Sequence, residues 1–270
     1  MIDRRRVAAL IRKDWRELSR NKQALAPLVI VPLLFVVVIP VAVILLGANT
    51  ALTSTVGGLQ SFLDHLPTDL LPADLTSQQA VVYAVRVYFM APFFLIIPVM
   101  VASITAASSF VGEKERRTIE GLLYTPLTDR ELVLGKVLVC VVPSVVLAWT
   151  SFAVYTVIVD VLAAPRLGEF VFPTVTWAVL VVVLVPLIAF LATCLVVAVS
   201  GRSSTMQEAQ GVAALVILPV VGLVVGQASG LMLFDVGVAL AVSAVVLVAD
   251  AAVYLAVVAR FRRERIVARL

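Results

Sequence analysis

The residues best suited to chemistry form a charged segment, 112–136, which lies between two long apolar runs. It reads GEKERRTIEGLLYTPLTDRELVLGK and mixes acidic with basic side chains. Glu113 and Arg117 are spaced for an i,i+4 ion pair on a helix, as are Arg116 and Glu120. A stiff helical surface of this kind can receive another protein through complementary charges.

Three motifs of enzymes and nucleotide-binding proteins are absent from the sequence. There is no GxxxxGK[S/T] phosphate loop, no HExxH and no GxSxG. The single histidine, His65, cannot build a multi-histidine metal site, and we read it as a solvated surface residue. Cys140 and Cys194 lie inside apolar runs, where packing residues are expected rather than a disulfide. We therefore expect no catalytic, cofactor or metal site on this chain.

The composition is that of an integral membrane protein. Hydrophobic residues make up 62% of the 270 residues and charged residues 14%, whereas soluble domains carry about a quarter charged residues. The longest polar stretch between apolar runs is roughly 40 residues, near the lower limit for unaided folding. We expect a single transmembrane domain over residues 1–270, with no separate catalytic domain and no nucleic-acid partner.

Six apolar segments are long enough to span a bilayer, which takes about 20 residues of helix. Helices are expected because a backbone in lipid must satisfy its own hydrogen bonds, and the alternating strands of a barrel are absent. The fifth segment holds Pro219 and several glycines, so it could be short, kinked or re-entrant. The predicted spans are 24–47, 87–110, 137–162, 174–199, 211–233 and 236–259.

The basic residues predict the orientation of these spans. Of the 21 lysines and arginines, only Arg86 and Arg166 fall on the side opposite to the termini. By the positive-inside rule, both termini, the charged segment and the basic tail 260–270 are cytoplasmic. The 48–85 segment is then an outer loop.

The N-terminal residues 1–23 fit an amphipathic helix in the cytoplasmic membrane interface. Its basic face would meet anionic lipid headgroups. The alternative is a solvated basic tail that serves topology alone, and no cleavable signal peptide is recognisable. The apolar stripe of this helix comprises Val7, Leu10, Ile11, Trp15 and Leu18.

An elbow of helix, turn and helix is predicted for 111–136. The second span continues as a helix to about Leu123, and Thr125-Pro126 ends it, since proline disfavours helical geometry in the residue before it. Thr128 and Glu131 have the spacing of a capping box that starts the next helix. The alternative is a solvated loop whose charges act only in topology.

Asp250 is the one acid deep inside an apolar run, where a charge costs a few kcal/mol on insertion scales. Two interpretations stay open: it faces a translocation path or a subunit interface, or it is a structural acid that is protonated or satisfied by a neighbouring serine. Asp160 lies nearer the outer end of its span. Polar positions on the inner half of the second span could line the path or pack it: Ser103, Thr105, Ser108 and Ser109.

The charged segment resembles the one that follows the second span of type-2 ATP-binding cassette permeases. There an EKERGTLE-like helix precedes a TP-L turn and a helix ending in Gly-Lys. Arg117 stands where glycine is common in that family. The matching residues are Glu113, Lys114, Glu115, Arg116, Thr118, Glu120, Leu122, Leu123, Thr125, Pro126, Leu127, Arg130, Glu131, Leu132, Gly135 and Lys136.

The resemblance implies a plasma-membrane permease subunit of an exporter. In the family the elbow is the coupling helix that docks on a separate ATPase subunit, and a second permease copy, identical or related, completes the assembly. ATP and Mg²⁺ would bind the ATPase, and the loop 200–210 occupies the position of a second cytoplasmic contact. The coupling residues implied are Glu113, Lys114, Glu115, Arg116, Arg117, Thr118, Glu120, Gly121 and Pro126.

A stand-alone, ion-coupled secondary transporter is the alternative. It would usually need more intramembrane acids than Asp160 and Asp250, and the broken segments of inverted repeats are not seen in both halves. The sequence does not identify the transported substrate.

Overall fold

The computed structural model describes residues 11–13, 15–16, 22–46, 76–115, 129–167, 172–229 and 231–260. Within these ranges the chain is helical and contains no strand. Six of the described helical stretches are long and apolar enough to cross a membrane, which confirms the all-helical prediction with six spans. They are Leu25–Ala42, Val82–Glu113, Leu134–Leu162, Val175–Ser200, Met206–Ala228 and Val236–Val257.

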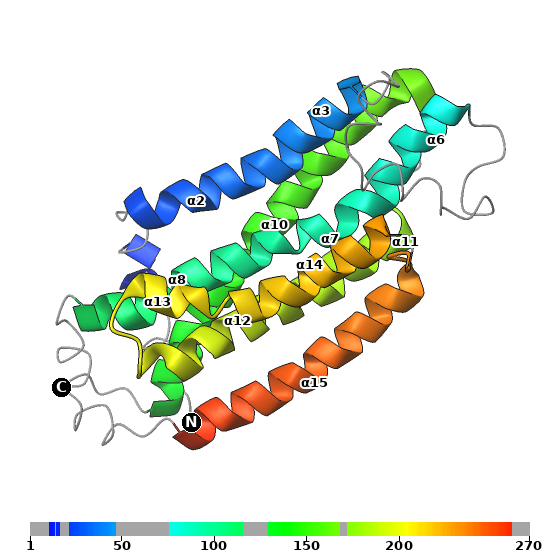
Figure 1. The fold of residues 1–270 in the computed structure, drawn as a ribbon. Coiled ribbons are helices and arrows are strands. Elements are labelled where there is room, and N and C mark those ends of the chain that lie inside the picture. Colours follow the sequence, from blue (N-terminus) through cyan, green and yellow to red (C-terminus); the bar gives the residue numbers. More distant parts are fainter. Residues whose placement is uncertain are drawn as a thin grey trace.

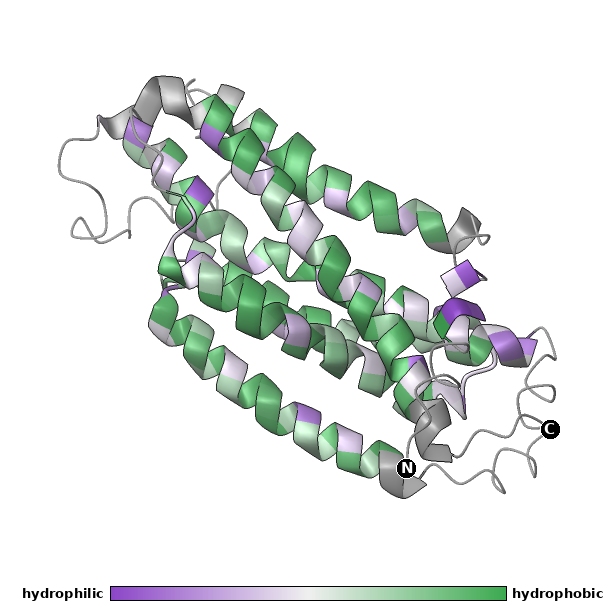
Figure 2. Ribbon diagram, turned by 180° about the vertical axis from the view of Figure 1, so that it is seen from behind, coloured by the Kyte–Doolittle hydropathy of each residue, from purple (hydrophilic) through white to green (hydrophobic). Residues whose placement is uncertain are grey.

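The spans run alongside one another as a bundle (Figure 1). The first span lines one edge of the bundle and the sixth lines the opposite edge, with the others between them (Figures 1 and 2). The elements are α2 (Lys22–Pro32), η1 (Leu33–Val38), α3 (Ile39–Leu46), α6 (Ser77–Ala84), η3 (Val85–Phe89), α7 (Met90–Phe94), α8 (Ile96–Glu115), α10 (Asp129–Leu167), α11 (Val175–Val179), η4 (Leu180–Leu184), α12 (Val185–Ser200), α13 (Met206–Gly211), α14 (Ala214–Ala228) and α15 (Val236–Arg260).

Helix α2 begins at one end of the bundle, and α8, α12 and α15 finish there (Figure 1). We call this the basal end of the bundle, and the opposite one the distal end. The ribbon is predominantly hydrophobic along the length of the spans, and many of the hydrophilic residues lie towards the two ends (Figure 2). This distribution is the one that a hydrocarbon layer between two aqueous phases requires.

The second and fourth spans form the centre of the bundle. In an apolar 18-residue stretch of each span, 78% of the residues are buried in the second span and 61% in the fourth, against 17% in the first and sixth. Helix α8 packs against α10, α12 and α13. Its buried face is rich in small side chains, which let helix backbones approach closely where lipid supplies no hydrophobic drive for association. These side chains include Ala102, Ser103, Ala106, Ala107 and Ser108.

Prolines interrupt the helical hydrogen bonding of several spans, and wide turns accompany them. The π-helical segments η1, η3 and η4 each end two or three residues before a proline, namely Pro40, Pro92 and Pro186. Proline lacks the amide N–H and its ring crowds the preceding turn, so a wider turn relieves the conflict.

The second span begins earlier than the sequence predicts. Helix α6 starts at Ser77, and the residues from Val82 to Val85 are buried, so the end of the predicted 48–85 loop belongs to the helix. Thr76 and Gln79 form the capping pair there, because the Thr76 Oγ1 accepts the Gln79 N–H and the Gln79 Oε1 accepts the Thr76 N–H. The polar Ser-Gln-Gln sequence conceals this helix start from a hydropathy reading.

Other predicted boundaries meet the limits of the described chain. Helix α8 runs on past the predicted end of the second span as far as Glu115, and α10 begins at Asp129. The turn of the predicted elbow, 116–128, lies outside the described residues, as do 47–75 and the tail 261–270. The fifth span is α13 followed by α14, which leads towards the distal end and contains Pro219 (Figure 1).

Candidate functional site

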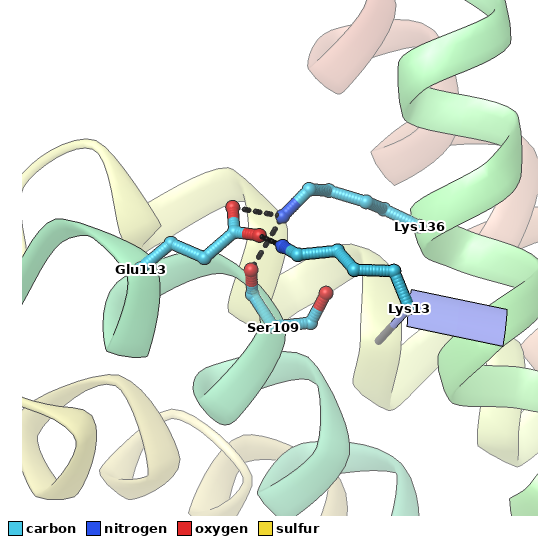
Figure 3. Close-up of polar contacts among 4 residues, drawn as sticks. All are labelled: Lys13, Ser109, Glu113 and Lys136. Atoms are coloured by element: carbon cyan, nitrogen blue, oxygen red, sulfur yellow. Dashed lines mark hydrogen bonds and ion pairs between the residues drawn. The ribbon is translucent and has the colours of Figure 1, made fainter. Parts of the chain in front are cut away.

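A buried ion cluster joins three segments at the basal end of the bundle. The side chain of Glu113, near the end of α8, is only 2% exposed. One carboxylate oxygen accepts from the Lys136 Nζ of α10 and the other from the Lys13 Nζ of the N-terminal segment, each at 2.5 Å. Figure 3 shows the two ammonium groups converging on this carboxylate. Glu113 therefore ties the N-terminal segment and the third span to the end of the second.

Lys136 is buried as deeply as its partner. Its side chain is 3% exposed, and besides Glu113 its Nζ donates to the backbone oxygen of Ser109 and lies 4.9 Å from the centre of the Phe110 ring. A buried ammonium is tolerated only when it is paired and hydrogen-bonded, and these contacts supply both conditions. Lys13, by contrast, is 46% exposed. The cluster thus has a buried half and a half open to the surroundings.

Glu115 links the same end of α8 to the loop that follows the fourth span. Its Oε1 accepts the backbone N–H of Met206, the first residue of α13, at 3.0 Å. A carboxylate at a helix N-terminus meets free amide groups and the positive end of the helix dipole. The elbow segment and the 200–210 loop, which the sequence treats as two separate contacts, therefore meet in one place.

Local sequence explains why α13 starts where it does. Thr205 is the N-cap, and its Oγ1 accepts the Glu208 N–H at 3.2 Å, while Glu208 accepts the Ser204 N–H at 2.7 Å. This reciprocal arrangement is a variant of the capping box, in which the Glu208 side chain accepts the N–H of Ser204 and not that of the N-cap Thr205. It gives a six-residue helix enough definition to present Met206 to Glu115.

The remaining predicted coupling residues are not placed. Arg116, Arg117, Thr118, Glu120, Gly121 and Pro126 lie outside the described residues, as does the side chain of Lys114. Glu115 is exposed, as a docking residue would be, whereas Glu113 faces the interior.

The polar residues of the second span lie inside the chain. Ser103, Thr105 and Ser108 are buried. Ser103 donates to the backbone oxygen of Met100, and Thr105 donates to those of Val101 and Ala102. Hydroxyls bonded back to their own helix are satisfied without an aqueous path. Ser109 contributes its backbone oxygen to the Lys136 contact. These positions indicate that the polar residues pack the interior of the chain and do not line a translocation path within it.

Asp250 is buried in α15, which packs against α12, and its exposed fraction is 4%. Within the described part of the chain, neither carboxylate oxygen has a hydrogen-bond partner. A neighbouring serine that satisfies the acid, which is one form of the structural interpretation, is thus not found among the described residues. An acid left in this state is costly to retain, which keeps a functional role open.

An ion pair near the distal end was missed by the sequence analysis. The Arg86 guanidinium in η3 pairs with the Asp160 carboxylate in α10 at 2.5 Å, and its side chain is only 2% exposed. The Phe172 ring lies 5.1 Å from the guanidinium carbon. The available signal was a pair of opposite charges near the outer ends of two predicted spans, but Arg86 falls just before the predicted start of the second span at 87.

Comparison with protein families accounts for most of the chain. Residues 8–237 match the model of the family described as ABC-2 family transporter protein. A comparison with curated proteins gave no match. The match extends from the N-terminal segment to the start of the sixth span, so it includes the ion cluster and both basal contacts. The chain is a multi-pass membrane protein and belongs to the ABC-2 family of transporter permeases.

Proposed function

We propose that the chain is the membrane-spanning permease subunit of an exporter and is driven by separate ATPase subunits that dock at the basal end. Membership of the family implies association with an ATP-binding cassette ATPase. The observation that carries the proposal further is the convergence on the end of α8: Glu113 holds the N-terminal segment and α10, and Glu115 holds α13. A push received there would reach the second, third and fifth spans together.

In this proposal the docking surface combines the start of the elbow, 113–126, with the 200–210 loop. Glu113 would transmit force inside the permease, and the exposed Glu115, together with Arg202, would border the partner. ATP and Mg²⁺ bind the ATPase, consistent with the lack of a phosphate loop here. The chain itself would not hydrolyse nucleotide.

The arrangement in the cell follows from the charges. We propose that the basal end is cytoplasmic, because the basic residues concentrate there, and, from the family, that the membrane is the plasma membrane. The N-terminal segment, with exposed Arg12, Trp15 and Arg16, lies in the membrane interface against anionic lipid. A second permease copy, identical or related, completes the path. Closure of the ATPase pair on ATP then rocks the two permeases.

Charge reversal of Arg202 tests the docking surface without disturbing the buried cluster. Arg202 is exposed in the turn between α12 and α13, where its side chain can meet a partner. We expect Arg202→Glu to fold normally but to lose most of the ATPase that copurifies with the tagged wild-type permease. Arg265→Glu is the matched control, because it makes the same charge change at a residue of the C-terminal sequence that the proposed surface, 113–126 and 200–210, does not include.

The outcomes separate the two function classes. If the wild-type permease brings down no subunit with a Walker motif and transports in proteoliposomes on an ion gradient alone, the ion-coupled secondary transporter is correct. If ATPase copurifies equally with Arg202→Glu and the wild type, the subunit class stands and the proposed surface is wrong.

A further inference from the structure

Two prolines leave a gap in the hydrogen bonding of two spans. In η3 the Met90 N–H donates to the Val85 oxygen, and in η4 the Val185 N–H donates to the Leu180 oxygen. Each of these two carbonyls therefore accepts from the amide five residues later, as in a π-helix. The carbonyls of Val87, two residues beyond Val85, and of Val181, one residue beyond Leu180, lie five residues before Pro92 and Pro186. Proline has no amide N–H, so neither Pro92 nor Pro186 can supply the fifth-residue donor that the π pattern would give these two carbonyls.

An indole fills each gap. The Trp177 Nε1 donates to the Val87 oxygen at 2.8 Å, and the Trp149 Nε1 donates to the Val181 oxygen at 2.9 Å. The donors come from neighbouring helices, α11 in the first case and α10 in the second. In lipid no water can take this role, so a side chain from another helix is the available donor. The same solution thus occurs twice, on the two central spans.

The two indoles differ in their surroundings. Trp177 is fully buried among aromatic rings, with the ring centres of Tyr155 at 5.1 Å and Phe172 at 5.2 Å. Trp149 is 47% exposed on the outside of the bundle. Because the hydrogen bond recurs in two such different environments, packing of the ring alone does not account for it.

We propose that the indole N–H groups of Trp177 and Trp149 replace the amide N–H groups that Pro92 and Pro186 lack, and so hold the two central spans in one of two helical registers used in transport. In an ordinary α-helix each carbonyl accepts from the amide four residues later. The carbonyls left without a proline N–H would then be those of Tyr88 and Val182 instead. Each indole bond therefore selects the π register.

A change of register turns part of the span. Removing the extra residue of a π turn rotates the helix before it by about 100° relative to the helix after it. In the second span, η3 also carries Arg86, whose carbonyl accepts the Tyr155 hydroxyl at 3.0 Å and whose guanidinium pairs with Asp160. The rotation would separate these groups. That the change occurs during transport rests on the proposed function.

A double-mutant cycle tests the substitution of donors. Trp177→Phe keeps an aromatic ring but removes the N–H, and Pro92→Ala supplies an amide N–H to the same turn. We expect Trp177→Phe to lower the Tm by about 2–4 °C more than the surface control Trp15→Phe does. The Tm is measured in detergent by circular dichroism. In the Pro92→Ala background the loss should fall to less than half. Equal losses in both backgrounds overturn the proposal.

The pair Trp149→Phe and Pro186→Ala repeats the cycle at the lipid-facing site. Less packing is lost there, so a drop in Tm that Pro186→Ala removes would point to the hydrogen bond itself. If Trp149→Phe behaves like Trp15→Phe, the missing N–H at Pro186 carries no cost and the inference fails for the fourth span.

Thiol labelling tests the register. Val82 precedes η3 and is 3% exposed, so Val82→Cys should react slowly with a maleimide in the parent protein. In Trp177→Phe/Pro92→Ala the α register becomes available, and labelling should be several-fold faster. An unchanged rate overturns the two-register proposal. Both this test and the Tm cycle use the permease alone, so they stand or fall independently of any ATPase.

A final arm uses the complex with its ATPase. We expect ATP to change the labelling rate of Val82→Cys in membranes that contain both subunits. If the ATPase copurifies and hydrolyses ATP while the rate stays constant, the register does not change in transport, and the proposed function survives without it. If no ATPase copurifies, the proposed function fails while the Tm cycle keeps its meaning.

Discussion

Among the single residues, three acids of the described chain differ in what neutralises them. Glu113 lies between two lysines and Asp160 pairs with a buried arginine, whereas Asp250 has no hydrogen-bond partner among the described residues. Removing one member of a buried pair leaves an uncompensated charge, while replacing both members by apolar groups is often close to neutral. The three sites should therefore respond differently to loss of charge.

Loss of the Glu113 charge should destabilise the permease strongly. Glu113→Gln leaves the buried Lys136 ammonium next to a second cation, so we expect a loss of about 3–5 kcal/mol in unfolding free energy. Lys136→Met in the same chain should restore most of it, because the stranded charge is gone. Thermal or denaturant unfolding in detergent measures both. Glu115→Gln is the exposed control, and a loss there as large as that of Glu113→Gln would show that burial does not set the cost.

Asp160 should show the same behaviour at the distal end. Asp160→Asn strands the Arg86 guanidinium, which is 2% exposed, and a similar loss of about 3–5 kcal/mol is expected. The double variant Arg86→Met/Asp160→Asn should be less destabilised than Asp160→Asn alone. Additive losses from the two substitutions would indicate that the pair is not coupled.

Asp250 should tolerate the loss of its charge. Asp250→Asn removes no hydrogen bond of the described chain and lowers the cost of burial, so unfolding stability should be unchanged or raised. If the acid serves transport, Asp250→Ala should reduce transport per folded complex more than Asp250→Asn, which keeps hydrogen-bonding capacity. Normal transport by both variants would make it a structural residue alone.

Among the elements, α13 owes its position to two carboxylates. Glu208 closes the capping box within the helix, and Glu115 reaches it from α8. The Thr205 and Glu208 spacing could be read from the sequence, as could that of Thr76 and Gln79 at the start of α6. The contact with Glu115 could not, because it joins residues 91 positions apart.

Removing the cap should loosen this element specifically. Thr205→Ala leaves the Glu208 N–H without its side-chain acceptor, at a cost of about 1 kcal/mol. We expect faster amide hydrogen exchange in 206–211 with little change in α14 or α15. Ser229→Ala is a suitable comparison, since that hydroxyl donates to carbonyls at the other end of the fifth span. Faster exchange throughout the bundle would mean that α13 is not an independent unit.

For the whole molecule, the six spans could be predicted because apolar length is a strong signal. Pairings across the bundle could not, since Lys13 and Glu113 are 100 positions apart and nothing local marks them as partners. The π turns were hidden for a similar reason: the prolines are visible in the sequence, but the indoles that satisfy the freed carbonyls come from other spans. Glu113 is an example: its charge in the sequence suggested a docking residue, but its side chain lies in the interior and pairs with lysines from two other segments.

The orientation of the bundle remains a prediction from charge asymmetry, and labelling can test it. Cysteines introduced at Ser61, in the predicted outer loop, and at Arg202, in the exposed turn after α12, should react with a membrane-impermeant maleimide from opposite sides. Intact cells should label only the first, and inverted vesicles only the second. Labelling of both from one side would rule out the six-span topology.

The central place of α8 and α12 has a consequence for biosynthesis. The second span leaves the ribosome well before the fourth, yet its small, hydroxyl-rich face is covered by α12. A nascent chain that ends after the third span therefore exposes the part of this face that α12 covers in the finished protein to lipid or to a membrane chaperone. We expect chains truncated before Val175 to be degraded rapidly by membrane proteases, and chains that extend beyond Ser200 to survive much longer in pulse-chase labelling.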